Sequence, residues 1–294
     1  MTNPSKPIHP LHDSSILRLI QIAIHEDVGS GDVTTECTVP LDNSALARFV
    51  VKQDGVVCGL PVLPLVFREF SSDINLKVLV DEGAAVSAGT VVATVEGPAH
   101  ALLGAERTAL NFMQRMSGVA TKTHQYVTRI AGTGARILDT RKTIPGWRLL
   151  DKYATSVGGA VNHRMGLHDM VMIKDNHITA CGGIRQAVGR CVEELQGRAP
   201  LKIEVEARNL DDVYEVLACV GIHRVMFDNF TPAQVAEGVR IVNRSMETEA
   251  SGGITWDNIR DYAQTGVDYV SVGAITHSAV ALDISMKLFV PKQG

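Results

Sequence analysis

The spacing of hydrophobic positions changes along the chain from a helical period to the short period of strands. In residues 14–26 the apolar positions suit one buried stripe of a helix, and Asp13, Ser14 or Ser15 can cap it. Residues 45–104 then alternate short valine-rich runs with glycine and proline turns. This part of the pattern predicts one helix followed by a small β-rich domain.

A long helical pattern over residues 106–130 separates the β-rich region from the rest, and Gly132 and Gly134 end it. Beyond it, short apolar runs recur between helical stretches. These runs end at Thr140, Lys174, Glu206, Asp228, Gly253 and Gly273. Strands that alternate with helices in this way indicate right-handed βαβ units and a parallel sheet.

The expected fold is α/β: a C-terminal, TIM-like α/β barrel of six or seven strands with an N-terminal β-rich α/β sandwich domain. A doubly wound sheet is the alternative. The barrel is favoured because functional-looking residues fall at the carboxyl end of every strand, whereas an open sheet concentrates them at one switch point. We expect a tail over 1–13, a first domain over 14–118, to which 280–294 are a candidate addition, and a barrel over 119–279.

Composition narrows the classes of protein that fit. The 294 residues are 45% hydrophobic and 20% charged, which is ordinary for a globular protein and argues against disorder and a membrane protein. A net charge of -4 argues against nucleic acid as the general partner. Residues 1–13 are polar and have no apolar core of the kind found in a signal peptide, so a cytoplasmic location is expected.

The average charge hides a basic segment. Between Arg107 and Lys174 there are eleven basic residues and three acidic ones, so this segment carries +8 in a chain of -4 overall. Most of these cations suit solvated helix faces. Arg141 and Lys142 differ because they directly follow a strand. His163 and Arg164, expected at the end of a glycine-containing helix, and the strand-end Lys174 join them at successive βα junctions.

Acidic residues and glycine turns occupy the remaining strand ends. Glu206 and Asp228 end the next two strands, and Glu204 lies on the same strand face as Glu206. Carboxylates there suit ribose hydroxyls, a magnesium ion or a developing positive charge, although a neutralising ion-pair network is the simpler reading. The glycine-rich turns at 251–254 and 271–278 follow the last two strands, where barrels commonly bind phosphate.

Taken together, these motifs resemble the quinolinate phosphoribosyltransferase family, also called nicotinate-nucleotide pyrophosphorylase (carboxylating). The resemblance runs from about residue 15 to 290. It rests on the ordered motifs EDVGSGDVTT at 26, ERTALNFMQRMSGVAT at 106, DTRKTIPG at 139, HRMGLHD at 163, IKDNH at 173, FDNF at 227, SGGI at 251 and SVGAITHS at 271.

The resemblance implies roles for particular residues. Quinolinate and phosphoribosyl pyrophosphate would be the substrates, with Mg²⁺ bound alongside the latter and no membrane or nucleic-acid partner. Arg107 would reach the site of a neighbouring subunit in a homodimer or higher even oligomer. Lys142, Glu206 and Asp228 would be catalytic, and no residue is a certain metal ligand. The full substrate-binding set would be Arg107, Thr140, Arg141, Lys142, His163, Arg164, Lys174, Glu206, Asp228, Ser251, Gly252, Gly253, Gly273, Ala274 and His277.

Several alternatives stay open at this stage. The run EVEARNL departs from the family's more acidic pattern, so Glu204 competes with Glu206 for the ribose and metal role. Lys174 also suits a Schiff-base nucleophile of an aldolase-like barrel, provided that its amine is desolvated. Residues 81–97 resemble a lipoyl or biotinyl carrier module, but this stretch lacks the lysine that would take the cofactor. A related phosphoribosyltransferase acting on nicotinate is the nearest competitor.

Overall fold

The protein is described here from a computed structural model that covers residues 14–289. Contacts between Cα atoms divide it into two compact units. The first unit comprises the chain up to His124, Thr143–Gly159 and the chain from Ser278, and the second comprises Gln125–Lys142 and Ala160–His277. Residues 143–159 therefore group with the first unit, although the sequence division assigns them to the barrel.

The first unit is built around an antiparallel sheet with the strand order β12-β1-β5-β3. Its strands are β1 (Ser44–Val51), β3 (Asn75–Val78), β5 (Val91–Pro98) and β12 (Ile284–Phe289), and β2 (Gly55–Val56) pairs separately with β4 (Ala85–Val86). The strand β12 pairs with most of β1, from Leu46 with Phe289 to Val51 with Ile284. The last described strand thus joins the sheet beside a strand from the first part of the chain.

Helices supply the other layer of this unit. They are α1 (Ser14–Val28), α2 (Val33–Thr38), the 3₁₀ helix η2 (Leu60–Val62), α3 (Leu63–Arg68), most of α4 (Ala99–Arg129) and α5 (Arg148–Val157). Alternate residues of β1 are buried, as expected of a strand with one covered face. Ile16 and Ile20 of α1 pack in the same core as Phe49 of β1 and Phe112 of α4.

The second unit is a six-stranded parallel sheet with the order β6-β11-β10-β9-β8-β7. The strands are β6 (Arg136–Leu138), β7 (Val171–Ile173), β8 (Ile203–Ala207), β9 (Arg224–Asp228), β10 (Glu247–Ser251) and β11 (Tyr269–Ser271). A parallel bridge between Leu138 and Val161 adds a further short segment beside β6. All six strands lie where the hydrophobic pattern predicts them.

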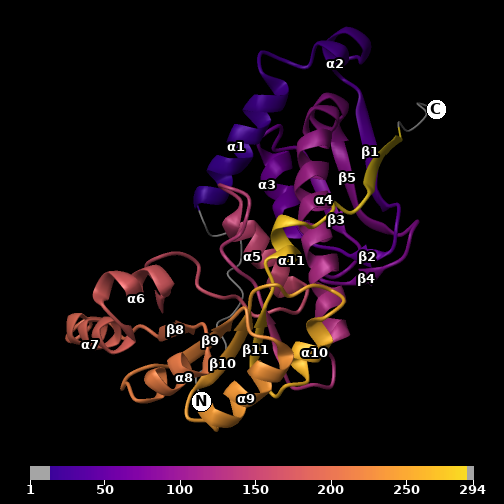
Figure 1. The fold of residues 1–294 in the computed structure, drawn as a ribbon. Coiled ribbons are helices and arrows are strands. Elements are labelled where there is room, and N and C mark those ends of the chain that lie inside the picture. The colour runs from indigo at the N-terminus through magenta and orange to yellow at the C-terminus, as the bar shows by residue number, and fades with distance from the viewer. Residues whose placement is uncertain (1–13, 290–294) are drawn as a thin grey trace. The chain divides into compact units, whose positions relative to one another are not determined.

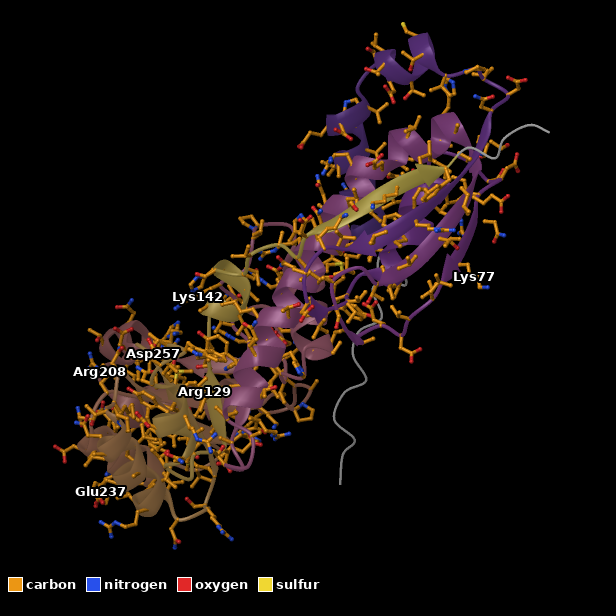
Figure 2. The ribbon with its side chains drawn as sticks, turned by 90° about the vertical axis from the view of Figure 1, so that its right-hand side faces the viewer. Lys77, Arg129, Lys142, Arg208, Glu237 and Asp257 are labelled. Atoms are coloured by element: carbon orange, nitrogen blue, oxygen red, sulfur yellow. The ribbon has the colours of Figure 1, made fainter. Side chains whose placement is uncertain are left out.

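The helices of this unit lie outside the strands, as Figure 1 shows for α8 and α9. They are α6 (Asp175–Cys181), α7 (Ile184–Glu194), α8 (Leu210–Leu217), α9 (Pro232–Val242), α10 (Ile259–Ala263) and α11 (Ala274–His277). The outer strand face supplies Val205, Val225, Phe227 and Val270 to a core shared with these helices. Charged pairs remain on the exposed surface, such as that of Arg240 with Glu237, which is labelled in Figure 2.

The inner strand face is polar. Because side chains alternate along a strand, Glu204, Arg224, Glu249 and Ser271 point to the side opposite the helix-facing core, and all four are buried. The two edge strands both contribute to one cavity, which is lined by Thr140, just after β6, and by Met172 of β7. The sheet is therefore curled into a barrel, which confirms the expected fold class. Over residues 14–289 none of the helices combines the length and apolar character needed to cross a bilayer.

Candidate active site

A cavity of about 510 Å³ opens where the parallel strands end. Its walls come from the residues at or just after the ends of five of the six strands. These residues are Thr140 after β6, Lys174 after β7, Asp228 of β9, Ser251 of β10 and Ser271 of β11. A barrel brings such residues together from distant parts of the sequence, and this end of a barrel is where catalytic groups are found.

Cations dominate the cavity wall. Arg141, Lys142, Arg164 and Lys174 all line it, and Lys142 is exposed to solvent (Figure 2). Burial and the nearby positive charge of Arg141 together lower the pKa of Arg164. Two guanidinium groups that disturb each other in this way are stabilised by a shared anion, and a guanidinium matches a carboxylate or phosphate through paired hydrogen bonds.

The turn that carries Arg141 and Lys142 is fixed from two sides. The Thr140 hydroxyl accepts a hydrogen bond of 3.0 Å from the backbone N–H of Lys142. The Thr276 hydroxyl donates to the Lys142 carbonyl at 2.8 Å. A Cβ atom at Gly273 would lie 2.9 Å from Cδ of Lys142 and 3.1 Å from Cδ2 of His277. Glycine at 273 therefore leaves the room that the Lys142 side chain occupies.

His163 and Arg164 reach the cavity in a different way from the one expected. They follow the single β-bridge at Val161 and do not end a helix, because α5 ends at Val157. The buried carboxylate of Asp139 then fixes this segment by accepting hydrogen bonds from the backbone N–H of His163 at 2.8 Å and from Nδ2 of Asn162 at 2.7 Å. A one-residue bridge leaves no hydrophobic period, so the sequence pattern did not indicate it.

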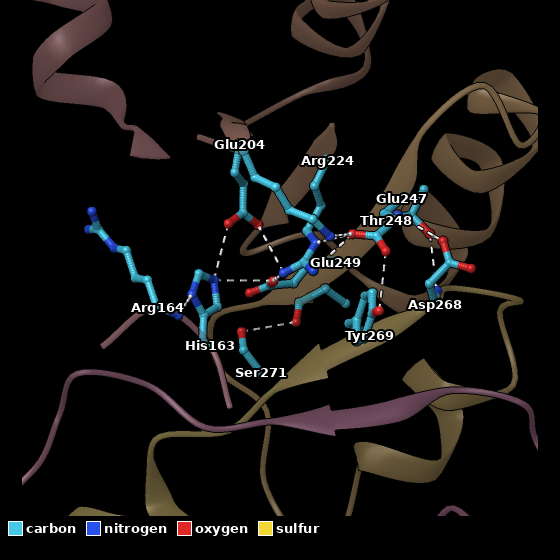
Figure 3. A network of polar contacts seen from close by, with 12 residues as sticks. His163, Arg164, Glu204, Arg224, Glu247, Thr248, Glu249, Asp268, Tyr269 and Ser271 are labelled. Atoms are coloured by element: carbon cyan, nitrogen blue, oxygen red, sulfur yellow. Dashed lines mark hydrogen bonds and ion pairs between the residues drawn. The ribbon is translucent and has the colours of Figure 1, made fainter. Parts of the chain in front are cut away.

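The ring of His163 contacts a buried charge network inside the barrel (Figure 3). Its Nε2 lies 3.1 Å from Oε2 of Glu204 and 3.4 Å from Oε2 of Glu249, and its Nδ1 lies 2.7 Å from the backbone nitrogen of Arg164. Arg224 NH1 lies 2.9 Å from Oε2 of Glu249. Burial acts to lower the pKa of His163, but the contacts with Glu204 and Glu249 outweigh it and raise the pKa to about 9.

The two glutamates of this network respond differently to burial. Burial and the neighbouring Glu249 raise the pKa of Glu204 to about 7. Burial also acts to raise the pKa of Glu249, but its contacts with His163 and Arg224 prevail, and its pKa is lowered. At neutral pH the network therefore holds Arg224, His163 and Glu249 charged, because the two cations stabilise one carboxylate more strongly than the other.

His163, Glu204 and Glu249 also have the spacing of a metal site, since one ligand atom from each lies within 4.8 Å of the others. The guanidinium of Arg224 lies 2.9 Å from Glu249 and 4.0 Å from Glu204. It already supplies positive charge to both carboxylates and would repel a divalent ion. The chemistry of this group of residues therefore fits an ion-pair network better than a metal site.

The two acids predicted at the strand ends lie in different surroundings. Oε2 of Glu206 on β8 lies 3.1 Å from Nζ of Lys174, and only 6% of Glu206 is exposed. Asp228 at the end of β9 lines the cavity, and its Oδ2 accepts a hydrogen bond of 2.7 Å from Nδ2 of Asn229. Glu204 lies deeper and contacts His163, so Glu206 is the glutamate closer to the strand ends.

A glycine turn completes the wall after β10. Ser251, Gly252 and Gly253 line the cavity, and both glycines have positive φ, 88° and 63°. A Cβ atom at Gly252 would lie 2.3 Å from Oδ1 of Asn229, so no other residue fits there without movement. The backbone N–H of Asn229 donates to the Ser251 carbonyl at 2.8 Å and ties this turn to the end of β9.

Most of the residues predicted from the sequence thus meet at one cavity. Those lining it are Thr140, Arg141, Lys142, His163, Arg164, Lys174, Asp228, Ser251, Gly252 and Gly253. Those not among its lining residues are Arg107, which belongs to the first unit, and Glu206, Gly273, Ala274 and His277. Lining residues that the sequence analysis did not name are Met172, Met226, Asn229, Glu249 and Ser271. The sequence could have predicted Glu249 as a residue of the site, because it lies two positions before Ser251 and therefore on the same face of the strand.

A larger cavity, of about 910 Å³, lies at the opposite ends of the strands. Its charged lining residues are Lys202, Arg244, Glu247 and Asp268, which are of both signs. None of the residues predicted to bind substrate lines it. The smaller cavity, with its excess of cations, is therefore the candidate active site.

Comparisons with known proteins agree with this geometry. Residues 32–117 match the family model "Quinolinate phosphoribosyl transferase, N-terminal domain", and residues 119–287 match the corresponding C-terminal domain. The chain belongs to the quinolinate phosphoribosyltransferase family. The resemblance stated from its motifs is thereby confirmed, and the two family domains meet near residue 118.

Individual relatives of this family match over nearly the whole chain. Quinolinate phosphoribosyltransferase [decarboxylating] 1b of Nicotiana tabacum is 42% identical over 96% of this chain and 84% of its own length. A chloroplastic nicotinate-nucleotide pyrophosphorylase [carboxylating] of Arabidopsis thaliana is also 42% identical, over the same shares. The solved structure of nicotinate-nucleotide pyrophosphorylase from Francisella tularensis superposes with a TM-score of 0.89 at 34% identity, covering 98% of this chain and 100% of that one.

Proposed function

We propose that the chain transfers the phosphoribosyl group of phosphoribosyl pyrophosphate to quinolinate and removes one carboxylate, giving nicotinate mononucleotide, pyrophosphate and CO₂. This is the pentosyl transfer of de novo NAD biosynthesis, catalysed by a nicotinate-nucleotide diphosphorylase (carboxylating). The single observation that carries the proposal is the cavity itself, in which Arg141, Lys142, Arg164 and Lys174 face Asp228 and a glycine turn.

Quinolinate binds on the cationic side of the cavity in this proposal. Its two carboxylates must approach a donor that is itself strongly negative, so the first task of the site is to overcome repulsion and fix orientation. The guanidinium groups of Arg141 and Arg164 suit the carboxylates through paired hydrogen bonds, and Lys142 and Lys174 add compact charges. His163 contributes the positive charge that its glutamate partners favour.

Phosphoribosyl pyrophosphate binds on the acidic side. Asp228 and Glu206, at the ends of adjacent strands, suit the ribose hydroxyls and Mg²⁺, because carboxylate oxygen is the ligand that Mg²⁺ prefers. When bound, Mg²⁺ would neutralise charge on the pyrophosphate. The turns at Ser251, Gly252 and Gly253, and at Gly273 and Ala274 with His277 nearby, suit the 5'-phosphate.

The chemistry then proceeds in two steps. The lone pair of the pyridine nitrogen forms a bond to C1 of the ribose as the bond from C1 to the pyrophosphate oxygen breaks, and Glu206 and Asp228 favour the ribosyl cation that develops. The bond to the carboxylate beside the nitrogen then breaks. Its electron pair stays on the ring carbon, where the quaternary nitrogen and Lys142 stabilise it until it takes up a proton.

Two further features belong to this proposal. We expect a homodimer, or a higher even oligomer, in which Arg107 reaches the cavity of a neighbouring subunit, since Arg107 is not among the described residues that line the cavity of its own chain. We also propose a cytoplasmic location.

A Schiff-base aldolase on the same barrel fits the site less well. Lys174 is held by the carboxylate of Glu206 at 3.1 Å, and 43% of its side chain is exposed. An amine that is partly exposed and paired with a carboxylate is not desolvated, whereas a Schiff-base lysine needs a desolvated amine.

The test is incubation with phosphoribosyl pyrophosphate, Mg²⁺ and either quinolinate or nicotinate. We expect quinolinate to give nicotinate mononucleotide with release of CO₂. We expect no comparable product from nicotinate. Turnover of nicotinate without CO₂ release would instead assign the chain to the related transferase. Borohydride trapping of a substrate on Lys174 would favour the aldolase.

A further inference from the structure

The charge network inside the barrel contains an arginine that the reaction described above does not use. Arg224, at the start of β9, is not among the residues lining the cavity at the strand ends, and only 6% of it is exposed. Its guanidinium lies 2.9 Å from Glu249 and 3.0 Å from Glu247. Burying a guanidinium costs desolvation free energy unless charged partners such as these offset it, so the two glutamates are needed to keep Arg224 in this position.

The partners of Arg224 lead directly to the cavity wall. Glu249 forms an ion pair with Arg224 on one side and lies 3.4 Å from Nε2 of His163 on the other. Nδ1 of the His163 ring in turn lies 2.7 Å from the backbone nitrogen of Arg164. Figure 3 shows these groups following one another across the barrel interior. Contacts therefore run from Arg224 to the segment that supplies two of the cavity's cations.

Without the guanidinium, the network would be hard to maintain. Glu204 and Glu249 are both fully buried, and close carboxylates repel when both are ionised. Oε1 of Glu249 and both oxygens of Glu204 have no hydrogen-bond partner of good geometry among the described residues. The positive charge of Arg224, at 2.9 and 4.0 Å from the two side chains, acts with that of His163 to keep the pair next to each other.

We propose that Arg224 is a positioning residue for the anion site: it holds the Glu204–Glu249 pair, which fixes the ring of His163 and, through it, the backbone of Arg164. This inference rests on the proposed function, because it assigns His163 and Arg164 to quinolinate. Arg224 touches neither substrate and acts only through the two glutamates. Its removal should therefore weaken quinolinate binding and leave the phosphoribosyl pyrophosphate side intact.

The test compares Arg224→Met and Arg224→Lys with the wild-type enzyme in steady-state assays. We expect Arg224→Met to raise KM for quinolinate about tenfold, because a buried acceptor loses its charged partner. KM for phosphoribosyl pyrophosphate should stay within about twofold. Arg224→Lys should recover most of the loss, since it restores the charge. Equal changes in both KM values, or none in a folded Arg224→Met protein, would overturn the proposal.

A spectroscopic measurement keeps the test decisive if Arg224→Met folds poorly. The ¹⁵N resonances of the His163 ring, assigned by their loss in His163→Gln, should shift in Glu249→Gln, which keeps the side-chain shape but removes the charge. They should not move in the control Tyr269→Phe, which removes a hydroxyl that contacts Glu247 at 3.2 Å on the far side of the network. Unchanged His163 resonances in Glu249→Gln would contradict the proposal. A wild-type enzyme inactive on quinolinate would instead refute the proposed function, and the resonances would still report on the network.

Discussion

At the scale of single residues, the charged side chains form two groups: some line the cavity, and others are buried inside the barrel. Arg141 and Lys142 lie on a partly exposed turn held by Thr140 and Thr276 through the backbone. Their side chains line the cavity, and neither is buried. The charges of Arg224, Glu204 and Glu249 are the reverse case, because they are buried and form ion pairs with one another inside the barrel.

This separation gives a prediction for the cavity cations. Arg141→Ala or Lys142→Ala should lower turnover of quinolinate by about 10² to 10³-fold, as expected when a group that stabilises developing charge is removed. The melting temperature should change by no more than a few degrees, because neither side chain is buried. Assays of CO₂ release together with thermal melts check this. Near-normal CO₂ release by either variant would rule out the assignment.

The raised pKa of His163 predicts a dependence of stability on pH. A histidine whose pKa rises from 6.5 to about 9 on folding stabilises the folded state fully below pH 6.5, and this contribution is lost as pH rises through 9. As pH rises from 6.5 to 9, the urea midpoint of the wild type should therefore decrease more than that of His163→Gln. The pKa of Glu204 rises from 4.5 to about 7 on folding, so the folded state also loses stability as pH rises through that lower range. Parallel midpoint curves for the two proteins would contradict the raised pKa.

At the scale of elements, close backbone approaches fix how α4 packs in the first unit. A Cβ atom at Gly118 would lie 2.0 Å from the Val280 carbonyl oxygen and 2.9 Å from Cα of Ala281. Both contacts are with backbone, which cannot rotate away as a side chain can. The helix therefore packs directly against the segment that leads into β12, and only glycine permits it.

Gly118→Ala should consequently lower the free energy of unfolding by about 1–3 kcal/mol, the cost of overpacking a tight interior. A matched control is Gly189→Ala on the exposed face of α7, where a Cβ atom would meet nothing within 4 Å. That change should raise stability by up to about 1 kcal/mol, because alanine is the better helix former. Denaturant titrations of both variants measure the contrast. Equal effects of the two substitutions would show that Gly118 is not tightly packed.

Elements also show what the sequence could and could not predict. The six barrel strands were predictable because each is a short apolar run that ends in a polar residue or glycine. The strand-end cations were predictable for the same reason. The bridge at Val161, which delivers His163 and Arg164, was not, because one residue carries no period. The role of Arg224 was hidden too, since the sequence does not show that β9 and β10 pair in the register that places Arg224 beside Glu247 and Glu249.

At the scale of the whole molecule, the remaining question is how Arg107 takes part. It lies on α4 in the first unit, whereas the lining of the cavity comes from residues of the second. The proposed dimer resolves this by supplying Arg107 from a neighbouring subunit. Each complete site would then need an intact Arg107 on one chain and an intact Lys174 on the other.

Mixing two inactive variants tests the shared site. Arg107→Ala and Lys174→Ala should each be inactive alone, because each lacks one cation in every site. After the two are mixed and reassembled, a hybrid dimer has one site with both defects and one with neither. With random pairing, about half of the dimers are hybrids with one active site each, so activity should return to about a quarter of the wild-type value. A mixture that stays inactive, although exchange of subunits is verified by native mass spectrometry, would place Arg107 outside the neighbouring site.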